Sequence, residues 1–439
     1  MRYISIHRLN DYVGQIITLN GWVHTLRDQK QMQFIILRNP TGMVQASLEK
    51  QRNPALAEVV STLTRESAVR LTGHVAQNPD VRLGGVEIQL AELHIENRAK
   101  SPLPIEPFGK DLPGLEPRLD WRHLDLRRPE NRLLFQVQTT VESAMRDFWQ
   151  REGFIEIHTP KIMGSASESG AELFELPYFE TIAYLAQSPQ FYKQMAMAAG
   201  LERVFEIGPV FRANPSFTSR HDTEFTSVDV EFSWIESHVD LMDFEEQWLR
   251  HTIFAVRQAH GEAIAEHFGS EVTVPDLPFP RITMEEALVR LRERGYTPPP
   301  QKQGDLCPHG ERLLGENILD DLGHEFVFLV DYPVSVRPFY HMRYPDNPTV
   351  TKSFDLLWKG LELTTGAQRE HRPDVLAVQA KEKGVRLKPI QYYLDFFKYG
   401  CPPHGGFGFG LTRMLMILLG FKNVREVTYL YRGPRRLYP

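Results

Sequence analysis

A glycine-rich stretch, residues 405–410, is followed directly by an apolar segment, residues 411–419, which is predicted to form a helix. Glycine lets the backbone approach a ligand closely, and the first turn of a helix offers unpaired N–H groups to an anion. Arg413 lies three residues past Gly410 and can donate two parallel hydrogen bonds to a phosphate. The stretch lacks the Gly-Lys-Ser/Thr of a Walker loop and comes too late in the chain for a Rossmann fingerprint. A phosphate site and a purely structural turn stay open as equal alternatives.

Two further arginines flank a polar loop in the middle of the chain. Arg212 follows a predicted strand, residues 205–211, and Arg220 lies in the loop that leads to the next predicted strand, residues 226–234. Arginines on either side of a hairpin can hold a polyphosphate between them. Taken alone, a solvated loop with ordinary surface charges is the simpler interpretation.

Two carboxylates and an arginine occupy strand-like segments further along the chain. Asp355 and Glu362 can point into one cavity, and carboxylates beside a triphosphate suit Mg²⁺, which prefers oxygen ligands. Arg369 then supplies a cation for a small carboxylate substrate. The alternative is a set of structural ion pairs within a sheet.

A loop and a helix start carry the fourth signal. Small residues surround Glu168 in the segment 165–171, which suits a loop that closes over a ligand. Gln190 and Lys193 are three residues apart, so they would share one face of a helix. The alternative is a surface loop followed by an ordinary helix start.

The elements that must position these residues fall into separate regions. Residues 1–101 are predicted to form four or five strands, which suggests a small closed barrel such as an oligonucleotide-binding (OB) fold, or another small barrel or sandwich. Six prolines within residues 102–129 predict a semi-rigid hinge. Residues 130–439 mix helical and strand patterns, with a more polar insertion at about 255–330. The predicted fold class is therefore multidomain α+β.

Composition excludes several classes of protein. A hydrophobic fraction of 42% and a charged fraction of 24% exclude a disordered or fibrous chain. The net charge of −6 argues against a DNA binder that uses its whole surface, but it permits a local basic patch. Cys307 and Cys401 are too few for a zinc box or a disulfide framework. With no apolar run of signal-peptide or membrane-spanning length, we expect a cytoplasmic protein.

Taken together, these stretches resemble the class II aminoacyl-tRNA synthetases. The three motifs of that class are matched by residues 154–160, by Phe211-Arg212 onwards and by residues 406–413. The match is closest to aspartyl-tRNA synthetases of the archaeal type, through residues 118–129, 187–194 and 360–371. The resemblance spans almost the whole chain. It implies a five-stranded OB-fold barrel that binds the anticodon, and a catalytic domain built on an antiparallel sheet flanked by helices.

The resemblance implies a reaction in two steps. Aspartate attacks the α-phosphate of ATP, with Mg²⁺ present, and the terminal ribose of the tRNA then takes the aspartyl group from the adenylate. By matching positions, catalysis is assigned to Arg212, Glu362 and Arg413. ATP binding is assigned to Arg212, Asn214, Arg220, His221, Asp222, Glu362, Gly410, Leu411, Thr412 and Arg413. Aspartate binding is assigned to Glu168, Gln190, Phe191, Tyr192, Lys193, Arg212, Asp229, Thr365 and Arg369, and the metal to Asp355, Glu362 and Thr365.

One position departs from the pattern of the family. The family usually carries an acid two residues after the second-motif arginine, where it accepts a hydrogen bond from the adenine amino group. This chain has Asn214 there, whose amide oxygen can accept the bond but carries no charge. Two expectations follow: weaker ATP binding, or compensation by Glu224 or another group.

The barrel is implied to recognise the anticodon. Phe34 matches an aromatic residue that stacks on a base, Gln45 matches one that contacts a base edge, and Arg27 is a candidate phosphate or base contact. The alternative for Phe34 is a place in the barrel core. His24 and Pro79 match residues typical of enzymes that charge both tRNA(Asp) and tRNA(Asn). We therefore hypothesise a non-discriminating enzyme whose Asp-tRNA(Asn) passes to a tRNA-dependent amidotransferase.

Three other functions are compatible with parts of this pattern. An asparaginyl-tRNA synthetase shares the architecture, but Lys193 and Arg369 offer two cations that suit a carboxylate and not a carboxamide. An asparagine synthetase-like enzyme shares the catalytic core but needs no anticodon-binding barrel. A paralogue that only binds tRNA would not need the intact catalytic set. The family also implies a homodimer built partly around Pro160.

Overall fold

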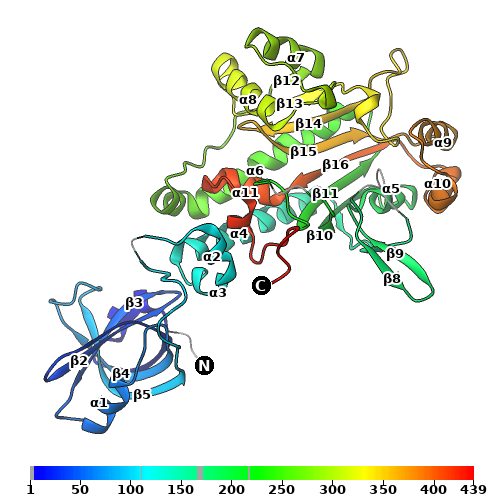
Figure 1. Ribbon diagram of the computed structural model, residues 1–439. Helices are drawn as coiled ribbons and strands as arrows, with labels where there is room; N and C mark the ends of the chain where they lie inside the picture. Colours follow the sequence, from blue (N-terminus) through cyan, green and yellow to red (C-terminus); the bar gives the residue numbers. More distant parts are fainter. Residues whose placement is uncertain (1–3, 110, 166–171, 216–217) are drawn as a thin grey trace. The chain divides into compact units, whose positions relative to one another are not determined.

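The computed structural model describes residues 4–109, 111–165, 172–215 and 218–439, and Figure 1 shows the course of the chain. The chain divides into two compact units, Met1–Pro113 and Gly114–Pro439. In the described residues, no helix combines the length and the apolar character that crossing a membrane requires.

The first unit is a closed five-stranded barrel, as predicted. Its strands are ordered β1-β2-β3-β5-β4, and alternating side chains such as Val69 and Leu71 fill the interior while Arg70 between them faces outward. The strands are β1 (Ile16–Asp28), β2 (Met32–Asn39), β3 (Gly42–Glu49), β4 (Ala68–Gln77) and β5 (Val86–Asn97). The helix α1 (Pro54–Ser61) connects β3 to β4, and its N-cap residue Asn53 accepts a hydrogen bond from the Leu56 N–H.

The second unit is built on an eight-stranded, mostly antiparallel sheet (Figure 1). Its order is β12 (Arg281–Thr283), β13 (Phe326–Val330), β14 (Ser353–Trp358), β15 (Leu361–Gln368), β16 (His404–Gly410), β11 (Glu224–Ser233), β10 (Arg203–Phe211) and β6 (Ile155–Glu156). A separate small sheet contains β7 (Ile162–Met163), β9 (Thr181–Leu185) and β8 (Glu175–Tyr178). The α+β class that the sequence predicted is confirmed.

Three helices cover one face of the large sheet: α4 (Pro129–Arg151), α6 (His238–Phe268) and α11 (Leu411–Leu419). Trp149 of α4 and Trp248 of α6 stack with their ring centroids 5.0 Å apart in this core. The start of α6 is fixed by a capping box between Ser237 and Asp240. Because these helices bury one face of the sheet, charged strand residues such as Asp229 and Glu362 lie on the opposite face.

The predicted hinge, residues 102–129, differs from the structure in its second half. Two short helices, α2 (Leu115–Asp120) and α3 (Arg122–Asp125), belong to the second unit. The guanidinium of Arg122 is buried and donates to the backbone carbonyls of Glu426 and Thr428 at 2.9 Å. These bonds join residues about 300 positions apart, so proline content alone gave no sign of them.

The predicted insertion at about 255–330 is not a separate element either. Helix α6 continues through Phe268 with Val256 and Ile264 in the core, and β12 and β13 are strands of the large sheet. The helices α7 (Met284–Glu293) and α8 (Pro308–Leu322) pack on these strands. The remaining helices are α5 (Gln190–Ala198), α9 (Pro373–Glu382), α10 (Gln391–Phe396) and α12 (Val424–Val427).

The carboxyl group of Glu245 on α6 is enclosed behind the sheet. Its side chain is 0% exposed, and one oxygen accepts a hydrogen bond from the hydroxyl of Thr364 on β15. Burial raises the pKa of Glu245 to about 8, and the nearby charges of Asp355 and Glu246 add to the shift. The folded protein therefore holds a proton here that the unfolded chain releases near pH 4.5.

Replacing Glu245 with glutamine is expected to raise the free energy of unfolding relative to the wild type. This difference should grow as the pH rises from about 5 to 8. The wild-type carboxyl binds its proton more tightly when folded, so its contribution to the free energy of unfolding falls over this interval. Glutamine keeps an acceptor for Thr364 and does not titrate, and each unit of pKa shift corresponds to about 1.4 kcal/mol. Denaturant midpoints of both proteins at several pH values test this, and parallel pH profiles would contradict it.

Candidate active site

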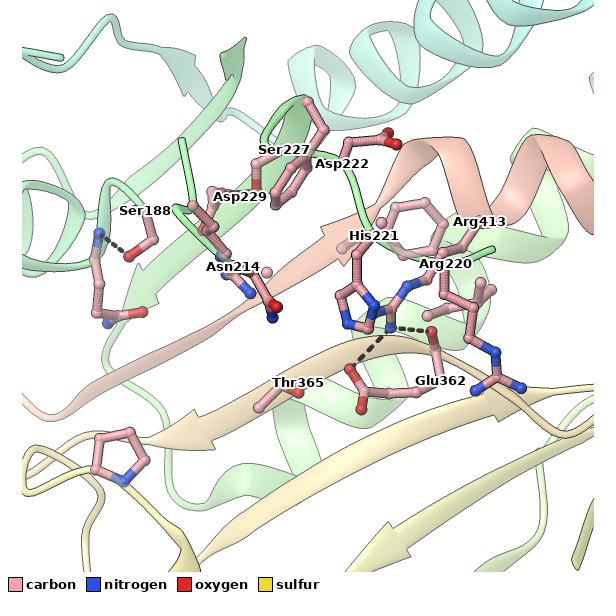
Figure 2. A pocket seen from close by; sticks show the side chains of 18 of the residues that line it. Ser188, Asn214, Arg220, His221, Asp222, Ser227, Asp229, Glu362, Thr365 and Arg413 are labelled. Atoms are coloured by element: carbon pink, nitrogen blue, oxygen red, sulfur yellow. Dashed lines mark hydrogen bonds and ion pairs between the residues drawn. The ribbon is translucent and has the colours of Figure 1, made fainter. Parts of the chain in front are cut away.

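A cavity of about 360 Å³ opens over the polar face of the large sheet. Its walls come from β11, β15, β16, the start of α11 and the loop between β10 and β11 (Figure 2). Many of the residues proposed from the sequence line it: Gln190, Arg212, Asn214, Arg220, His221, Asp222, Asp229, Glu362, Thr365, Arg369, Gly410, Thr412 and Arg413. Segments that are distant in sequence are therefore brought to one place.

The glycine-rich stretch forms the floor of this cavity as strand β16. Phe407 and Phe409 point into the core, where both rings contact Trp248. Gly408, which lies between them, and Gly410 line the cavity, and a Cβ at Gly406 would lie 2.3 Å from the Glu231 Oε2 atom. The stretch is therefore a strand and not a turn, and glycine is required because buried side chains approach its backbone closely.

Arg413 and Glu362 face each other across one end of the cavity (Figure 2). Arg413 Nη1 donates to the Glu362 backbone oxygen at 2.7 Å and to Oε1 at 3.2 Å. The two side chains remain 23% and 37% exposed, so both are accessible to a ligand in the cavity. A cation and an acid in contact at the cavity edge can bind a phosphate and a metal ion side by side.

The loop between β10 and β11 adds more positive charge to the same end. Arg212 lies over the ring of Phe225, with its guanidinium carbon 5.4 Å from the ring centroid. Arg220 Nη1 is 2.7 Å from Glu311 Oε2 on α8, which ties the loop to that helix. With Arg413, three arginines line the cavity at this end, which suits a polyphosphate.

His221 and Asp222 of this loop have shifted pKa values. Burial, and then the charges of Arg413, Arg212 and Arg220, lower the pKa of His221, so its imidazole is neutral. Burial raises the pKa of Asp222 to about 7 against the opposing charges of two arginines. Asp222 is 6% exposed, and its Oδ1 has no hydrogen-bond partner in the described residues.

The sequence suggested Asn214, with Glu224 as a possible substitute, for recognition of adenine. Asn214 lines the cavity. Glu224, the residue named to compensate for it, is exposed and does not line the cavity. Asp222, whose carboxyl group is buried, lines the cavity as well (Figure 2).

Two buried cations and two buried anions lie at and beneath the opposite end of the cavity; of the four, Arg369 and Asp229 line it. Lys193 Nζ lies 2.9 Å from Asp229 Oδ1 and 3.5 Å from Glu231 Oε2. Arg369 Nε donates to Glu231 Oε1 at 3.0 Å, and Nη2 donates to the Gly406 oxygen at 2.8 Å. The sequence suggested that Lys193 and Arg369 offer two cations to a carboxylate, and in the structure each cation is paired with an acid. An entering carboxylate must therefore share or displace these partners.

Several proposed residues lie away from the cavity. Phe191 is 1% exposed and stacks on Tyr393 at 4.1 Å between ring centroids, in a separate aromatic cluster. Tyr192 and Leu411 do not line the cavity, and Leu411 is buried in the core behind it. Lys193 reaches Asp229 from beneath the cavity without lining it. Glu168 lies outside the described residues.

The residues proposed for a metal ion lie on neighbouring strands. Asp355 of β14 is directly opposite Thr365 of β15 in the register. Asp355 is buried and ion-paired with Arg337, 2.7 Å from its Oδ2, while its Oδ1 has no partner in the described residues. Burial raises the pKa of Asp355; the charge of Arg337 opposes this, and that of Glu362 adds to it, so the two acids are close together.

This donor set fits a hard divalent cation that brings its own phosphate ligands. Within the described part of the chain, no cluster of three or more His, Cys, Asp or Glu side chains has metal-binding geometry. Mg²⁺ is usually held by one or two carboxylates together with substrate phosphates and water. Glu362 supplies a carboxylate in the cavity, whereas Asp355 is buried and does not line it; its Oδ1 has no hydrogen-bond partner among the described residues and would become a second ligand if the ion reached it.

Sequence reasoning missed several residues of the site. Glu231, which pairs with both Lys193 and Arg369, lies two residues after Asp229 on the same strand. Side chains two apart on a strand share a face, so this one could have been found. Arg337 and His341 also line the cavity, but they come from an irregular segment in which periodicity gives no signal.

On the barrel, three of the proposed anticodon residues form one surface cluster. Arg27 lies with its guanidinium carbon 5.8 Å from the Phe34 ring centroid, and its Nη2 donates to Gln45 Oε1 at 3.3 Å. Phe34 is partly exposed and is not a member of the buried barrel core. His24 instead packs edge-on against Phe108 at 5.0 Å, and Pro79 lies exposed in the β4–β5 connection.

Comparison with known proteins supports the same architecture. A model of an OB-fold nucleic acid binding domain matches residues 17–96, and one of tRNA synthetases class II (D, K and N) matches residues 114–432. The Aspartate–tRNA(Asp/Asn) ligase of Methanopyrus kandleri is 46% identical over 427 residues, 97% of this chain and 96% of that protein. The Aspartate–tRNA(Asp) ligase of Pyrococcus abyssi is 43% identical over 427 residues, 97% of each.

A solved structure extends the likeness to the whole chain. The asparaginyl-tRNA synthetase of Pyrococcus horikoshii, complexed with asparaginyl-adenylate, has a TM-score of 0.91 and 31% identity, and the match covers 100% of both chains. The resemblance inferred from the three motifs is thus confirmed. The chain belongs to the class II tRNA synthetases of the D, K and N group.

Proposed function

We propose that the protein attaches L-aspartate to tRNA(Asp) and to tRNA(Asn) through an aspartyl-adenylate. The relatives named for aspartate, at 42–46% identity, support the amino acid, although their names divide between tRNA(Asp) alone and both tRNAs. Aspartate is proposed as the amino acid because two buried cations are paired with two buried anions at the amino-acid end of the cavity.

The charges at this end of the cavity favour a substrate with two carboxylates. Lys193 and Arg369 balance Asp229 and Glu231 before any ligand enters. A bound aspartyl-adenylate adds an ammonium, a side-chain carboxylate and a phosphate, and the phosphate would meet a third protein cation, Arg212, from the other end of the cavity. Positive and negative charges then number four each. Asparagine would leave one buried positive charge without a partner, which is costly in a desolvated site.

In the proposed reaction the protein acts by positioning and by stabilising charge. The α-carboxylate of aspartate is itself the nucleophile, so no side chain has to serve as a general base. Arg212 would hold the α-phosphate and Arg413 the far end of ATP, as the charge that develops in the transition state requires. Bound Mg²⁺, held by Glu362 and Asp355, would neutralise phosphate oxygens. Asp229 would receive the substrate ammonium and so release Lys193 for the side-chain carboxylate.

The experiment that tests this function is ATP–pyrophosphate exchange with aspartate or asparagine, followed by charging of the two purified tRNAs. Exchange with aspartate is expected, whereas exchange with asparagine alone would indicate an asparaginyl enzyme. Exchange with neither would indicate a paralogue that only binds tRNA. A preference for one tRNA above about a hundredfold, or ~2.7 kcal/mol, would refute the non-discriminating character.

Changing Phe34 to alanine is expected to lower kcat/KM for tRNA charging by about 5- to 150-fold. The loss corresponds to one stacked base, which is worth about 1–3 kcal/mol. Pyrophosphate exchange should be unchanged because Phe34 belongs to the barrel unit and not to the catalytic unit. The matched control is His74→Ala, an exposed aromatic residue on β4 outside the Arg27–Phe34–Gln45 cluster. Loss of exchange in the Phe34 variant would argue against separate modules.

We also infer that the protein works as a homodimer in the cytoplasm, with Pro160 at the interface. Pro160 is exposed between Ile155 and Ile162, each 48% exposed, so apolar surface is concentrated there. Light scattering of the wild type and of Ile162→Asp tests this, with a monomer expected for the variant. In the proposed role, Asp-tRNA(Asn) would be the substrate of a tRNA-dependent amidotransferase.

A further inference from the structure

We propose that His341 determines specificity in the amino-acid end of the cavity, by accepting a hydrogen bond from Arg369 at Nε2 and offering Nδ1–H to the side-chain carboxylate of the substrate. The inference rests on the proposed function, because it assigns a role in choosing aspartate over asparagine. His341 lines the cavity and is 3% exposed.

The backbone around His341 fixes the place of its ring. His341 forms an isolated antiparallel bridge with Arg369, and its carbonyl accepts a hydrogen bond from Gln379 Nε2 at 3.2 Å. Arg369 Nη1 lies 3.2 Å from His341 Nε2. A guanidinium nitrogen can only donate, so Nε2 must accept. The single proton of the ring is therefore carried by Nδ1.

A second proton on the ring is strongly disfavoured. Burial, and then the positive charge of Arg369, hold the pKa of His341 well below its ordinary value. The other charged groups that act on the ring are Arg337, Lys383 and Lys193, and all of them carry the same sign. The imidazole thus stays a neutral acceptor for Arg369 at any pH at which the enzyme would work.

The Nδ1 atom is a buried polar group without a hydrogen-bond partner in the described residues. Leaving a buried donor unpaired is unfavourable, so its presence in a cavity wall indicates a ligand that accepts from it. The cavity would have to adjust locally around the ligand for the contact to form, because Nδ1 is covered in this conformation.

Arg369 has one N–H group left for the same ligand. Within the described chain, four of its five N–H groups have acceptors: two on Glu231, one on Gly406 and one on His341. The groups that remain, one Nη1–H of Arg369 and Nδ1–H of His341, are both donors. A carboxylate accepts from both, whereas a carboxamide turns its own N–H groups towards donors in half of its orientations and carries no charge to balance.

The test uses three variants at this position and one control, all measured by pyrophosphate exchange. His341→Leu removes both nitrogens, His341→Gln keeps an acceptor near the Nε2 position, and His341→Asn keeps a donor near the Nδ1 position. The control is His238→Leu on α6, a histidine that is 6% exposed, also has an unpaired Nδ1 and lies outside the cavity. Thermal unfolding of all four variants reports whether the fold is kept.

We expect His341→Leu to raise the KM for aspartate at least about tenfold while kcat changes less than threefold and the KM for ATP stays constant. The preference for aspartate over asparagine should fall by a similar factor. Asn and Gln should each restore part of the loss, and His238→Leu should leave all of these constants unchanged. If His341→Leu does not fold, the test is the smaller rise of the KM for aspartate that is expected in the Asn and Gln variants.

Two results would overturn the inference alone. One is a His341→Leu variant that folds and has a KM for aspartate within twofold of the wild type. If that variant does not fold, the same result for the folded Asn and Gln variants counts in its place. The other is a parallel rise of the KM for aspartate and the KM for ATP, which indicates a structural role only. If the wild type shows no aspartate-dependent exchange, the proposed function itself fails and the inference fails with it, so the two failures are distinguishable.

Discussion

Replacing Arg369 with leucine is expected to reduce kcat/KM for aspartate-dependent pyrophosphate exchange by more than about a thousandfold, or ~4 kcal/mol. Arg369 is 2% exposed and contacts Glu231, Gly406 and His341. In the proposed function, its remaining N–H binds the side-chain carboxylate of the substrate. The variant loses this contact and leaves the carboxylate of Glu231 with Lys193 as its only cation within 4 Å among the described side chains.

The same change is expected to lower the free energy of unfolding by about 3–5 kcal/mol, because breaking a buried ion pair leaves an uncompensated charge. Arg290→Leu on α7 is the matched control, since Arg290 forms surface ion pairs with Glu286 and Asp321 that contribute at most about 1 kcal/mol. Denaturant unfolding and exchange assays on both variants check the prediction. An Arg369 variant as stable as the control and active within tenfold of the wild type would show that the buried pair is dispensable.

Arg413→Ala is expected to lower adenylate formation by about 10²- to 10³-fold, the usual cost of removing one group that stabilises developing charge. Stability should change little, because the side chains of Arg413 and Glu362 are 23% and 37% exposed and form a solvent-screened pair. Arg413→Lys keeps the charge but not the planar fork, so we expect it to recover only part of the activity. Glu362→Ala should lower adenylate formation at least as much, because it removes the carboxylate proposed to hold the metal ion.

Binding of tRNA by the Arg413 variant provides the control for this prediction. The barrel is a separate unit, so tRNA should bind with nearly wild-type affinity in a filter-binding or anisotropy assay. Simultaneous loss of tRNA binding and of exchange would mean that the substitution acts on the fold. Retention of exchange within tenfold of the wild type would remove Arg413 from the catalytic set.

The sequence predicted those elements whose pattern is local. The apolar spacing of residues 134–148 gave helix α4, and the alternation in residues 86–93 gave strand β5, because a half-buried surface imposes a period on any sequence. It failed where stability comes from distant partners. Strand β12 has three residues and is held by its neighbour β13, so its own pattern was too short to be recognised.

The site shows the same division between local and distant information. Arg212, Glu362 and Arg413 could be named because their types and neighbours indicate phosphate and metal chemistry. The raised pKa of Asp222, the pairing of Asp355 with Arg337 and the pairing of Lys193 with Asp229 could not. Each of these depends on burial or on a partner at least 18 positions away, and a linear pattern contains neither.

The alternation of glycine and phenylalanine on β16 links folding to substrate entry. A shift of this strand by one residue would turn Phe407 and Phe409 into the cavity and leave their places beneath the sheet empty. A misaligned strand would therefore lose core packing and obstruct the substrate in the same event. A chain with β16 in the wrong register would therefore be unstable. Among variants of residues 404–410, folded enzymes that are slow because the cavity is half blocked should be rare.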